Sequence, residues 1–283
     1  MEKKYIIYHD GIKVDVVEAK ADTTHDVQIS VLGEPGFTAK PFGQYRDVEL
    51  ESQGFIKVAS ANGSLFFNEG TSTYANGIEK AFGIVHENDD AAWDNNMGFY
   101  HSNGVPYMYT QRYIKSIINR SDVRGAITAA FGLLNNGVQD ISGAKIGQPS
   151  RGIYLQKSGR TIIGKRADNT IVMAVFDGVS GVSGMTGYQT FLYARDVLKL
   201  RNAVCMDGGG STYLEYKGEV VNGSSHVGPN AVAIYIRSKS PSIVVGDKVR
   251  VEGLFTVEEI VGDLARLKEV GTWVSLSNLK EEV

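Results

Sequence analysis

One short stretch of this sequence carries a carboxylate, three glycines and two hydroxyls in succession, from Asp207 to Thr212. A carboxylate can stabilise a developing positive charge or attack an electrophilic carbon. Adjacent glycines tolerate positive φ and allow a ligand close to the backbone, and their N–H groups can form an anion-binding nest. The stretch therefore predicts a site for an anionic substrate. A tight turn that begins with Asp is the structural alternative.

The residues before Asp207 predict the elements that position it. Residues 188–199 place apolar side chains at helical spacing, and residues 203–206 form an apolar run. The predicted order is a helix, a buried strand, a glycine turn and another strand. Asp207 is thus expected at a strand end, where open sheets place their sites.

Three more polar residues stand at the ends of predicted strands. Asn62 follows the apolar run 55–61, Arg160 begins a strand-like segment, and Asp177 follows another. A carboxylate can activate water, and a guanidinium can hold phosphate through two parallel hydrogen bonds. Each residue also has a structural alternative: Asn62 as a turn former, Asp177 as the start of a turn, and Arg160 as the partner of Asp177 in an ion pair.

The composition limits the classes of function. A chain of 283 residues, 42% of them hydrophobic and 22% charged, can bury a substantial core. Its 33 glycines and many short Val/Ile runs favour a strand-rich fold. The net charge of −3 gives no electrostatic reason to bind a nucleic acid polymer or an anionic membrane. Without a signal peptide or a spanning segment, we expect cytoplasmic synthesis, with release by lysis or carriage in a phage particle left open.

Several familiar motifs are absent or incomplete. The single cysteine, Cys205, lies in an apolar run and predicts a buried, inert thiol. No His-x-x-x-His pair, EF-hand spacing or Gly-x-Ser-x-Gly elbow occurs. Gly159 to Arg166 imitates a Walker A loop, but Arg166 stands where Ser or Thr would hold magnesium. A divalent cation held by Asp207 and neighbouring carbonyls stays open, because the ligand set is incomplete.

The pattern of runs and turns predicts an α+β fold, with a mixed, strand-rich α/β catalytic domain over residues 1–238. The residues 238–242, Ser-Lys-Ser-Pro-Ser, are typical of a linker. Four or five short strands over residues 243–283 predict a small SH3-like β-barrel. Within the first domain we expect hairpins over 5–17, 159–176 and 213–221, a strand and hairpin over 124–137, and a solvated loop over 86–104.

Five segments, taken in order, resemble the phosphodiester glycosidase family. They are Asn62-Gly63 followed by Phe66-Phe67, Gly159-Arg160-Thr161-Ile162-Ile163-Gly164, Val175-Phe176-Asp177-Gly178, Asp207-Gly208-Gly209-Gly210-Ser211 and Pro229-Asn230-Ala231-Val232-Ala233-Ile234. The resemblance covers residues 5–237. It implies a mixed α/β fold and a hydrolase that breaks the bond between the anomeric carbon of a sugar and a phosphodiester oxygen. The implied substrate is of the N-acetylglucosamine-1-phosphodiester type.

The implied reaction gives the candidate residues their roles. Asp207 and Asp177 are the candidate catalytic carboxylates, Asp207 at the anomeric carbon and Asp177 for water activation. The candidate substrate-binding residues are Asn62, Arg160, Gly208, Gly209, Gly210 and Ser211. Arg160 and the backbone N–H groups would hold the phosphate, while Asn62 and Ser211 would hydrogen-bond sugar or phosphate oxygens. Ser211 could instead cap its own backbone.

Two other functions stay open at this point. A phage or bacterial enzyme could use the same site on phosphate-linked glycans and reach the cell wall through the barrel, since small SH3-like modules on such proteins often bind cell walls. The protein could also bind a sugar phosphate or a nucleotide without turning it over.

Overall fold

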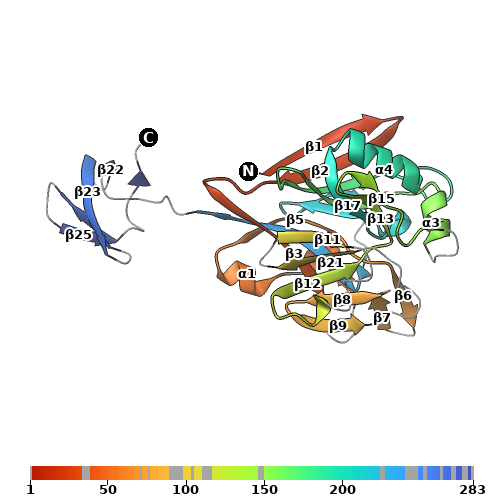
Figure 1. The fold of residues 1–283 in the computed structure, drawn as a ribbon, viewed down its shortest axis with the longest axis horizontal. Helices are drawn as coiled ribbons and strands as arrows, with labels where there is room; N and C mark the ends of the chain where they lie inside the picture. The colour runs from red at the N-terminus through yellow and green to blue at the C-terminus, as the bar shows by residue number, and fades with distance from the viewer. Residues whose placement is uncertain are drawn as a thin grey trace. The chain divides into compact units, whose positions relative to one another are not determined.

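The computed structural model describes residues 2–33, 39–69, 72–75, 77–88, 98–102, 105–109, 117–145, 150–223, 227–239, 248–250, 254–261, 264–268, 272–275 and 280–281. The chain divides into two compact units, the first of residues 1–21 and 27–237 and the second of residues 22–26 and 238–283. The first unit combines many strands with a few short helices (Figure 1). The predicted mixed, strand-rich α+β class is confirmed.

The largest sheet of the first unit has seven strands. In sheet order these are β1 (Glu2–His9), β2 (Ile12–Ala19), β16 (Ile171–Phe176), β15 (Arg160–Arg166), β17 (Leu200–Cys205), β13 (Phe131–Asn135) and β14 (Val138–Gln139). The hairpins predicted over 5–17 and 159–176 are confirmed as β1–β2 and β15–β16. β15 and β17 are antiparallel, with Ile162 opposite Cys205. The start of β15 and the end of β17 therefore lie at the same end of the sheet.

Two five-stranded sheets complete the main body of this unit. The second sheet has the order β19 (Glu219–Gly223), β18 (Tyr213–Tyr216), β5 (Ile56–Asn62), β21 (Asn230–Ser238) and β3 (His25–Gly33). The third has the order β11 (Val105–Tyr109), β10 (Gly98–Ser102), β12 (Val123–Thr128), β8 (Ile78–Ala81) and β9 (Ile84–Asn88). Short ladders join β20 (Val227–Gly228) to β4 (Lys40–Pro41) and β6 (Phe66–Glu69) to β7 (Ser72–Ala75).

Short helical segments cap these sheets. They are η1 (Phe42–Gln44), α1 (Val48–Ser52), α3 (Arg151–Leu155), α4 (Gly187–Asp196) and η3 (Gly209–Ser211). Thr186 and Gln189 begin α4 with a reciprocal capping box. The helix ends before the predicted residue 199, because Lys199 adopts a φ of +57° that a helix does not permit.

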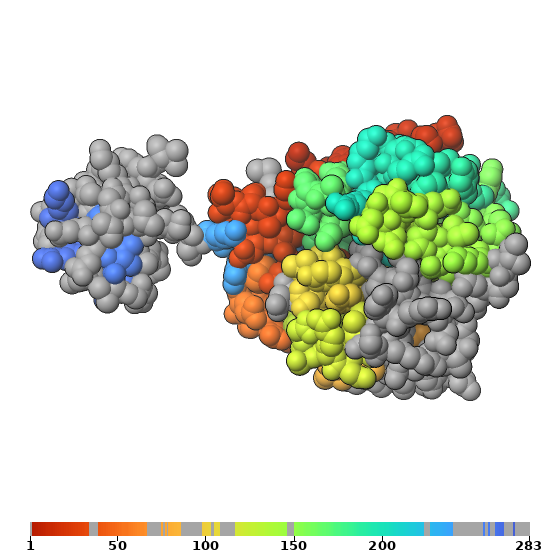
Figure 2. All heavy atoms as spheres, in the orientation of Figure 1, coloured from red at the N-terminus to blue at the C-terminus, as the bar shows by residue number. Residues whose placement is uncertain are grey.

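Hydrophobic cores lie on both faces of the seven-stranded sheet. One core joins this sheet to the second sheet, with Ile163 and Val204 in the same cluster as Val232. The other core lies between the sheet and α4, where the rings of Phe176 and Tyr193 are 5.1 Å apart. Figures 1 and 2 show α4 beside the N-terminal hairpin on this face. The sheet that carries the candidate site is therefore covered on both faces.

Two local predictions are wrong in part. The segment 124–137 divides between two sheets, because β12 joins the third sheet and β13 pairs with β17. Ala129 and Ala130 between them are buried, so their apolar character gave no sign of the crossing. Within the predicted loop 86–104, Gly98–Ser102 forms β10 and Phe99 is buried.

The second unit has one described sheet of five strands. Its order is β25 (Thr272–Ser275), β24 (Leu264–Leu267), β23 (Leu254–Val261), β22 (Lys248–Arg250) and β26 (Lys280–Glu281). Val257, Ala265 and Leu267 form its buried cluster. The SH3-like assignment of residues 243–283 stays a prediction, and residues 240–242 of the predicted linker lie outside the described residues. In the part of the chain that the structure describes, no helix is long and apolar enough to cross a membrane.

Candidate active site

Asp207 lies two residues beyond the end of β17, close to the predicted strand end, and two contacts of its backbone hold it there. Its N–H donates to the Gly63 carbonyl at 3.1 Å, and its own carbonyl accepts from Asn62 Nδ2 at 2.9 Å. Both contacts lead to the end of β5, in the second sheet. The position of Asp207 is thus set by two sheets at once.

The carboxylate of Asp207 is partly buried, and its surroundings act on its pKa in opposite directions. Burial raises the pKa to about 6. Hydrogen bonds from the Ser211 hydroxyl and from the Gly208 N–H, 2.8 Å from Oδ1, favour the ionised form, as does the charge of Arg160. Carboxyl groups with a raised pKa cluster at functional sites, so Asp207 is a candidate functional residue.

The residues after Asp207 pack against the start of β15, and this contact requires glycine. A Cβ on Gly208 would lie 2.6 Å from the Gly159 carbonyl oxygen. Gly209 has a φ of +61°, and a Cβ there would also lie 3.2 Å from Ser158 Oγ. The glycine run therefore brings the backbone of two strand ends into direct contact.

The sequence predicts that the backbone N–H groups of residues 208–211 form an anion-binding nest. In the structure, three of these groups donate to acceptors of the protein itself. The Gly208 N–H donates to Asp207, that of Gly209 donates to Gly159 at 3.0 Å, and that of Ser211 donates to Gly208 at 3.2 Å. Two of these donors bond within the loop, and the third bonds to the residue before β15. Gly210 is the exposed residue of the run. Substrate contact by Gly208, Gly209, Gly210 or Ser211 stays a prediction.

Arg160 is buried beneath the site, with a side chain only 1% exposed. Its Nε donates to the Met185 carbonyl at 2.9 Å, and its Nη2 donates to the carbonyls of Ile153 at 2.7 Å and Gln156 at 2.6 Å. Burial lowers the pKa of the guanidinium, and the charge of Asp207 acts against this. Arg160 therefore ties α3 and Met185, two residues before α4, to the start of β15, and the predicted phosphate contact remains to be tested.

Asn62 is fully buried, and its side chain joins three segments. Its Nδ2 donates to Asp207, while its Oδ1 accepts from Thr161 Oγ1 at 2.6 Å and from the Tyr213 N–H at 3.0 Å. These bonds position β17, β15 and β18 against β5. The structure thus gives Asn62 a positioning role, whereas its predicted bond to substrate is untested.

Asp177 is exposed at the end of β16 and belongs to a polar cluster that was not among the predictions from the sequence. Its Oδ1 accepts from Asn222 Nδ2 at 2.6 Å, and the same nitrogen lies 2.8 Å from Asp15 Oδ2. Lys13 Nζ is 2.7 Å from that oxygen, and this hydrogen bond raises the pKa of the lysine. Asp177 is therefore held by Asn222 and not by Arg160, the ion-pair partner considered above.

A signal for this cluster was present in the sequence. Asp15 interrupts the apolar run Val14 to Val17, and the structure buries it to 1% exposure. A buried carboxylate needs a partner, and Lys13 two residues away on the same strand face is the nearest one in the chain. Asn222 had no comparable signal, because it lies 207 residues from Asp15 in a polar hairpin.

The strand registers place Asp177 and Asp207 at the same end of the seven-stranded sheet. Arg160 is paired with Phe176, the residue before Asp177, and a Cβ on Gly178 would lie 2.5 Å from the Gly159 nitrogen. Gly159 contacts Gly208 on its other side. Because one strand lies between the chains of Asp177 and Asp207, their backbones are separated by about two strand spacings, roughly 10 Å. Asp177 and Asp207 therefore both lie at the end of the sheet where β16 and β17 finish and β15 begins.

The described residues gather no set of side chains typical of a metal site. Within the described residues, no group of three or more His, Cys, Asp or Glu side chains is gathered closely enough to hold one. Cys205, the single cysteine, is fully buried, and burial raises the pKa of its thiol to about 12. The cysteine is thus a core residue, in agreement with the prediction of an inert thiol.

Comparison with known proteins places these observations in a family. The sequence profile of the phosphodiester glycosidase family matches residues 56–237. No curated protein sequence matches this chain. The chain is similar to the solved catalytic domain of zebrafish N-acetylglucosamine-1-phosphodiester alpha-N-acetylglucosaminidase, auto-inhibited by its pro-peptide, with a TM-score of 0.58 and 17% identity over 83% of this chain and 82% of that one. A hypothetical protein from Synechocystis is similar with a TM-score of 0.51 and 12% identity, over 83% of this chain and 61% of that one.

The fold, and the partly buried Asp207 carboxylate beyond the end of β17, are consistent with a hydrolytic enzyme of the glycosidase class. The profile match spans more than half of the chain, and this protein belongs to the phosphodiester glycosidase family. The resemblance found in the sequence is confirmed for the first unit, while the matched range ends before residue 238. Family membership supports glycosidase activity on a sugar phosphodiester.

Proposed function

We propose that this protein hydrolyses the bond between the anomeric carbon of N-acetylglucosamine and a phosphodiester oxygen. The observation that carries the proposal is the Asp207 carboxylate, which lies beyond the end of β17 and accepts hydrogen bonds from the Ser211 hydroxyl and the Gly208 N–H. The choice of sugar follows the printed name of the zebrafish enzyme. The choice of bond follows the family to which the chain belongs.

Asp207 is the group proposed to act at the anomeric carbon. Breaking the C–O bond leaves positive charge on the sugar ring, in an oxocarbenium-like transition state. Above its pKa of about 6, Asp207 is an anion that stabilises this charge. The departing phosphodiester is a weak base, so the reaction needs little help from a general acid.

Asp177 is proposed to receive a proton from the attacking water. Its carboxylate is exposed, and the bond from Asn222 at 2.6 Å fixes one of its oxygens while leaving the other for solvent. In the overall reaction, water adds OH to the anomeric carbon, and its second proton goes through Asp177 to the solvent or to the released phosphate. Arg160 and Asn62 position the Asp207 loop and do not take part in proton transfer.

An isotope experiment tests the proposal. The protein is incubated in oxygen-18 water with methyl N-acetylglucosamine 1-phosphate and with UDP-N-acetylglucosamine, beside the variants Asp207→Asn and Asp196→Asn. We expect oxygen-18 in the released sugar, with the rate reduced at least about a thousandfold in Asp207→Asn. Asp196 is an exposed residue of α4 that pairs with Arg195, so Asp196→Asn serves as the matched control and should retain full activity.

The position of the label separates this function from the alternatives. Oxygen-18 in the phosphate would mean cleavage of a P–O bond and would replace the glycosidase with a phosphodiesterase. Stoichiometric binding of either compound without product would indicate a protein that sequesters its ligand. Unchanged hydrolysis by Asp207→Asn would remove Asp207 from the chemistry.

A further inference from the structure

A cavity lies at the opposite end of the seven-stranded sheet from Asp207. It has a volume of about 310 Å³, which is within the range of small-ligand pockets. Lys165 near the end of β15 and Ile171 at the start of β16 line it, together with the turn between these strands. Because β15 runs from Arg160 at the candidate active site to this cavity, the two sites are separated by roughly 17 Å of strand.

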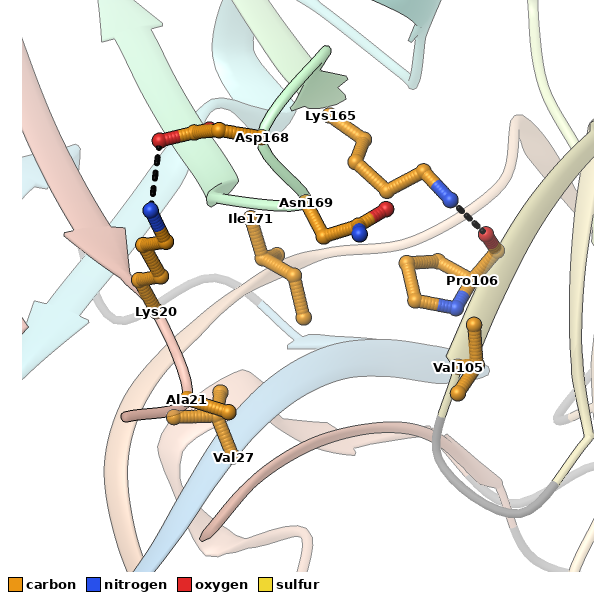
Figure 3. Close-up of a pocket in the computed structure, with 9 residues that line it drawn as sticks. All are labelled: Lys20, Ala21, Val27, Val105, Pro106, Lys165, Asp168, Asn169 and Ile171. Atoms are coloured by element: carbon orange, nitrogen blue, oxygen red, sulfur yellow. Dashed lines mark hydrogen bonds and ion pairs between the residues drawn. The ribbon is translucent and has the colours of Figure 1, made fainter. Parts of the chain in front are cut away.

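The cavity has an apolar floor with polar groups on two sides of it (Figure 3). Its apolar lining consists of Ala21, Val27, Val105, Pro106 and Ile171. Its polar lining consists of Lys20, Lys165, Asp168 and Asn169. A ligand that fits both parts has an apolar body and at least one group that accepts hydrogen bonds.

Lys165 is the feature that indicates the charge of the ligand. Its Nζ donates to the Pro106 carbonyl at 3.2 Å and lies 5.7 Å from the centre of the Tyr107 ring. In the described part of the chain, no carboxylate lies within ion-pair distance of this ammonium group. Burial lowers the pKa of Lys165, and the neighbouring charge of Arg201 adds to this effect.

The other charged groups do not cancel the charge of Lys165. Lys20 Nζ is 3.0 Å from Asp168 Oδ2, and Figure 3 shows this pair on the side of the cavity away from Lys165. Asp168 is further held by Thr170, and the bonds from Thr170 and Lys20 lower its pKa to about 2. The cavity thus keeps one uncompensated positive charge, next to the amide of Asn169.

We propose that this cavity binds a small organic anion, with its carboxylate or phosphate group on Lys165 and its apolar body on Val105, Pro106 and Ile171. A half-buried ammonium group without a counter-ion is unfavourable, and a bound anion offsets this cost. The apolar floor adds the favourable burial of the apolar body of the ligand. The inference does not depend on the reaction at Asp207.

Calorimetric titration with four probes tests both halves of the proposal. Phenyl phosphate and benzoate carry an anion on an apolar ring, benzyl alcohol lacks the anion, and inorganic phosphate lacks the ring. We expect one or both aromatic anions to bind at least about tenfold more tightly than the two incomplete probes. Equal affinity for inorganic phosphate and phenyl phosphate would overturn the apolar half, and equal affinity for benzyl alcohol would overturn the anionic half.

Variants locate the binding. Lys165→Met keeps the aliphatic stem and should weaken the aromatic anion at least about tenfold, whereas Lys165→Arg should retain its affinity within about threefold. Val105→Asp changes a side chain that is 45% exposed, so it should fold and should repel the anion. Lys217→Met, in the turn after β18, is the matched control and should bind normally.

Asp207→Asn separates this cavity from the candidate active site. An anion that binds normally to Asp207→Asn and weakly to Lys165→Met and Val105→Asp lies where we propose. Binding that is lost in Asp207→Asn and kept in Lys165→Met would place the anion at the other end of the sheet and overturn the proposal. The absence of saturable binding by any probe to the wild-type protein would overturn it as well.

Discussion

The raised pKa of Asp207 determines how the proposed activity should depend on pH. If the carboxylate acts as an anion, kcat/KM for hydrolysis should rise with pH and level off above about 6, where Asp207 is ionised. The measurement is a pH–rate profile with methyl N-acetylglucosamine 1-phosphate over pH 4 to 9. A profile that falls as pH rises through 6 would show that Asp207 acts as a proton donor.

The same pKa predicts an effect on stability with an unusual sign. An unfolded Asp titrates near 3.9, so a folded pKa of about 6 means that the folded protein binds the proton more tightly. The ionised carboxylate therefore makes folding less favourable as pH rises from about 4 to about 6. Asp207→Asn should unfold at a higher temperature than the wild type at pH 8, and the difference should shrink towards pH 4.

Asp196 provides a control of the opposite sign. The hydrogen bond from Arg195 lowers the pKa of Asp196, so its ionised form favours folding at neutral pH. Because Asp196 is exposed, the effect of Asp196→Asn should be small and slightly destabilising at pH 8. Equal melting temperatures of Asp207→Asn and the wild type at every pH would contradict the assigned burial of Asp207.

At the scale of elements, Asn62 connects the two sheets that carry the site. Replacing it by Ala leaves the Asp207 carbonyl, the Tyr213 N–H and the Thr161 hydroxyl without their partner. We expect Asn62→Ala to lower the free energy of unfolding by about 3 kcal/mol. Thr161→Val removes one of the three bonds and should cost about 1 kcal/mol. Chemical denaturation measures the free energy of unfolding of both variants. Equal losses would show that the bonds of Asn62 to Asp207 and Tyr213 add nothing to stability.

The loop after β16 contains two glycines that should respond differently to substitution. Gly184 has a φ of +97°, and a Cβ there would overlap the Ser158 carbonyl group. Gly181 has a φ of +74° with open space around it. Gly181→Ala should cost about 1–2 kcal/mol through its conformation alone, and Gly184→Ala at least about 3 kcal/mol. Comparable denaturation midpoints for the two variants would argue against the close packing of this loop on β15.

Local patterns predicted the elements of the site better than its contacts. The positions of β15, β16 and β17 followed from apolar runs, and that of Asp207 from the glycines after β17. The partners of Asn62 could not be predicted, because its bond to Asp207 spans 145 residues. Arg160 was expected to hold a phosphate because its chemistry suits one, and that contact stays a prediction; its bonds from Nε and Nη2 to three backbone carbonyls could not be predicted, because they depend on how α3 packs.

At the scale of the whole molecule, the division into two units predicts that the second can be removed. The family match ends at residue 237, and residues 238–283 belong to the second unit. We expect a chain that ends at residue 239 to unfold cooperatively and to keep the hydrolytic activity of the full chain within about threefold. Thermal unfolding and the isotope assay, run on both chains, provide the check. Loss of activity in a folded, shortened chain would assign the second unit a part in catalysis.

The order of strands in the second sheet has a consequence for the time course of biosynthesis. β3 is made early, yet its sheet neighbour β21 begins roughly 200 residues later in the chain. At 5–20 residues per second, a ribosome needs roughly 10–40 s to make the intervening chain. During that interval the apolar residues of β3, such as Ile29 and Val31, have no partner strand to cover them. The speed of translation and the supply of chaperones should therefore govern how much of this protein reaches its folded state in a cell.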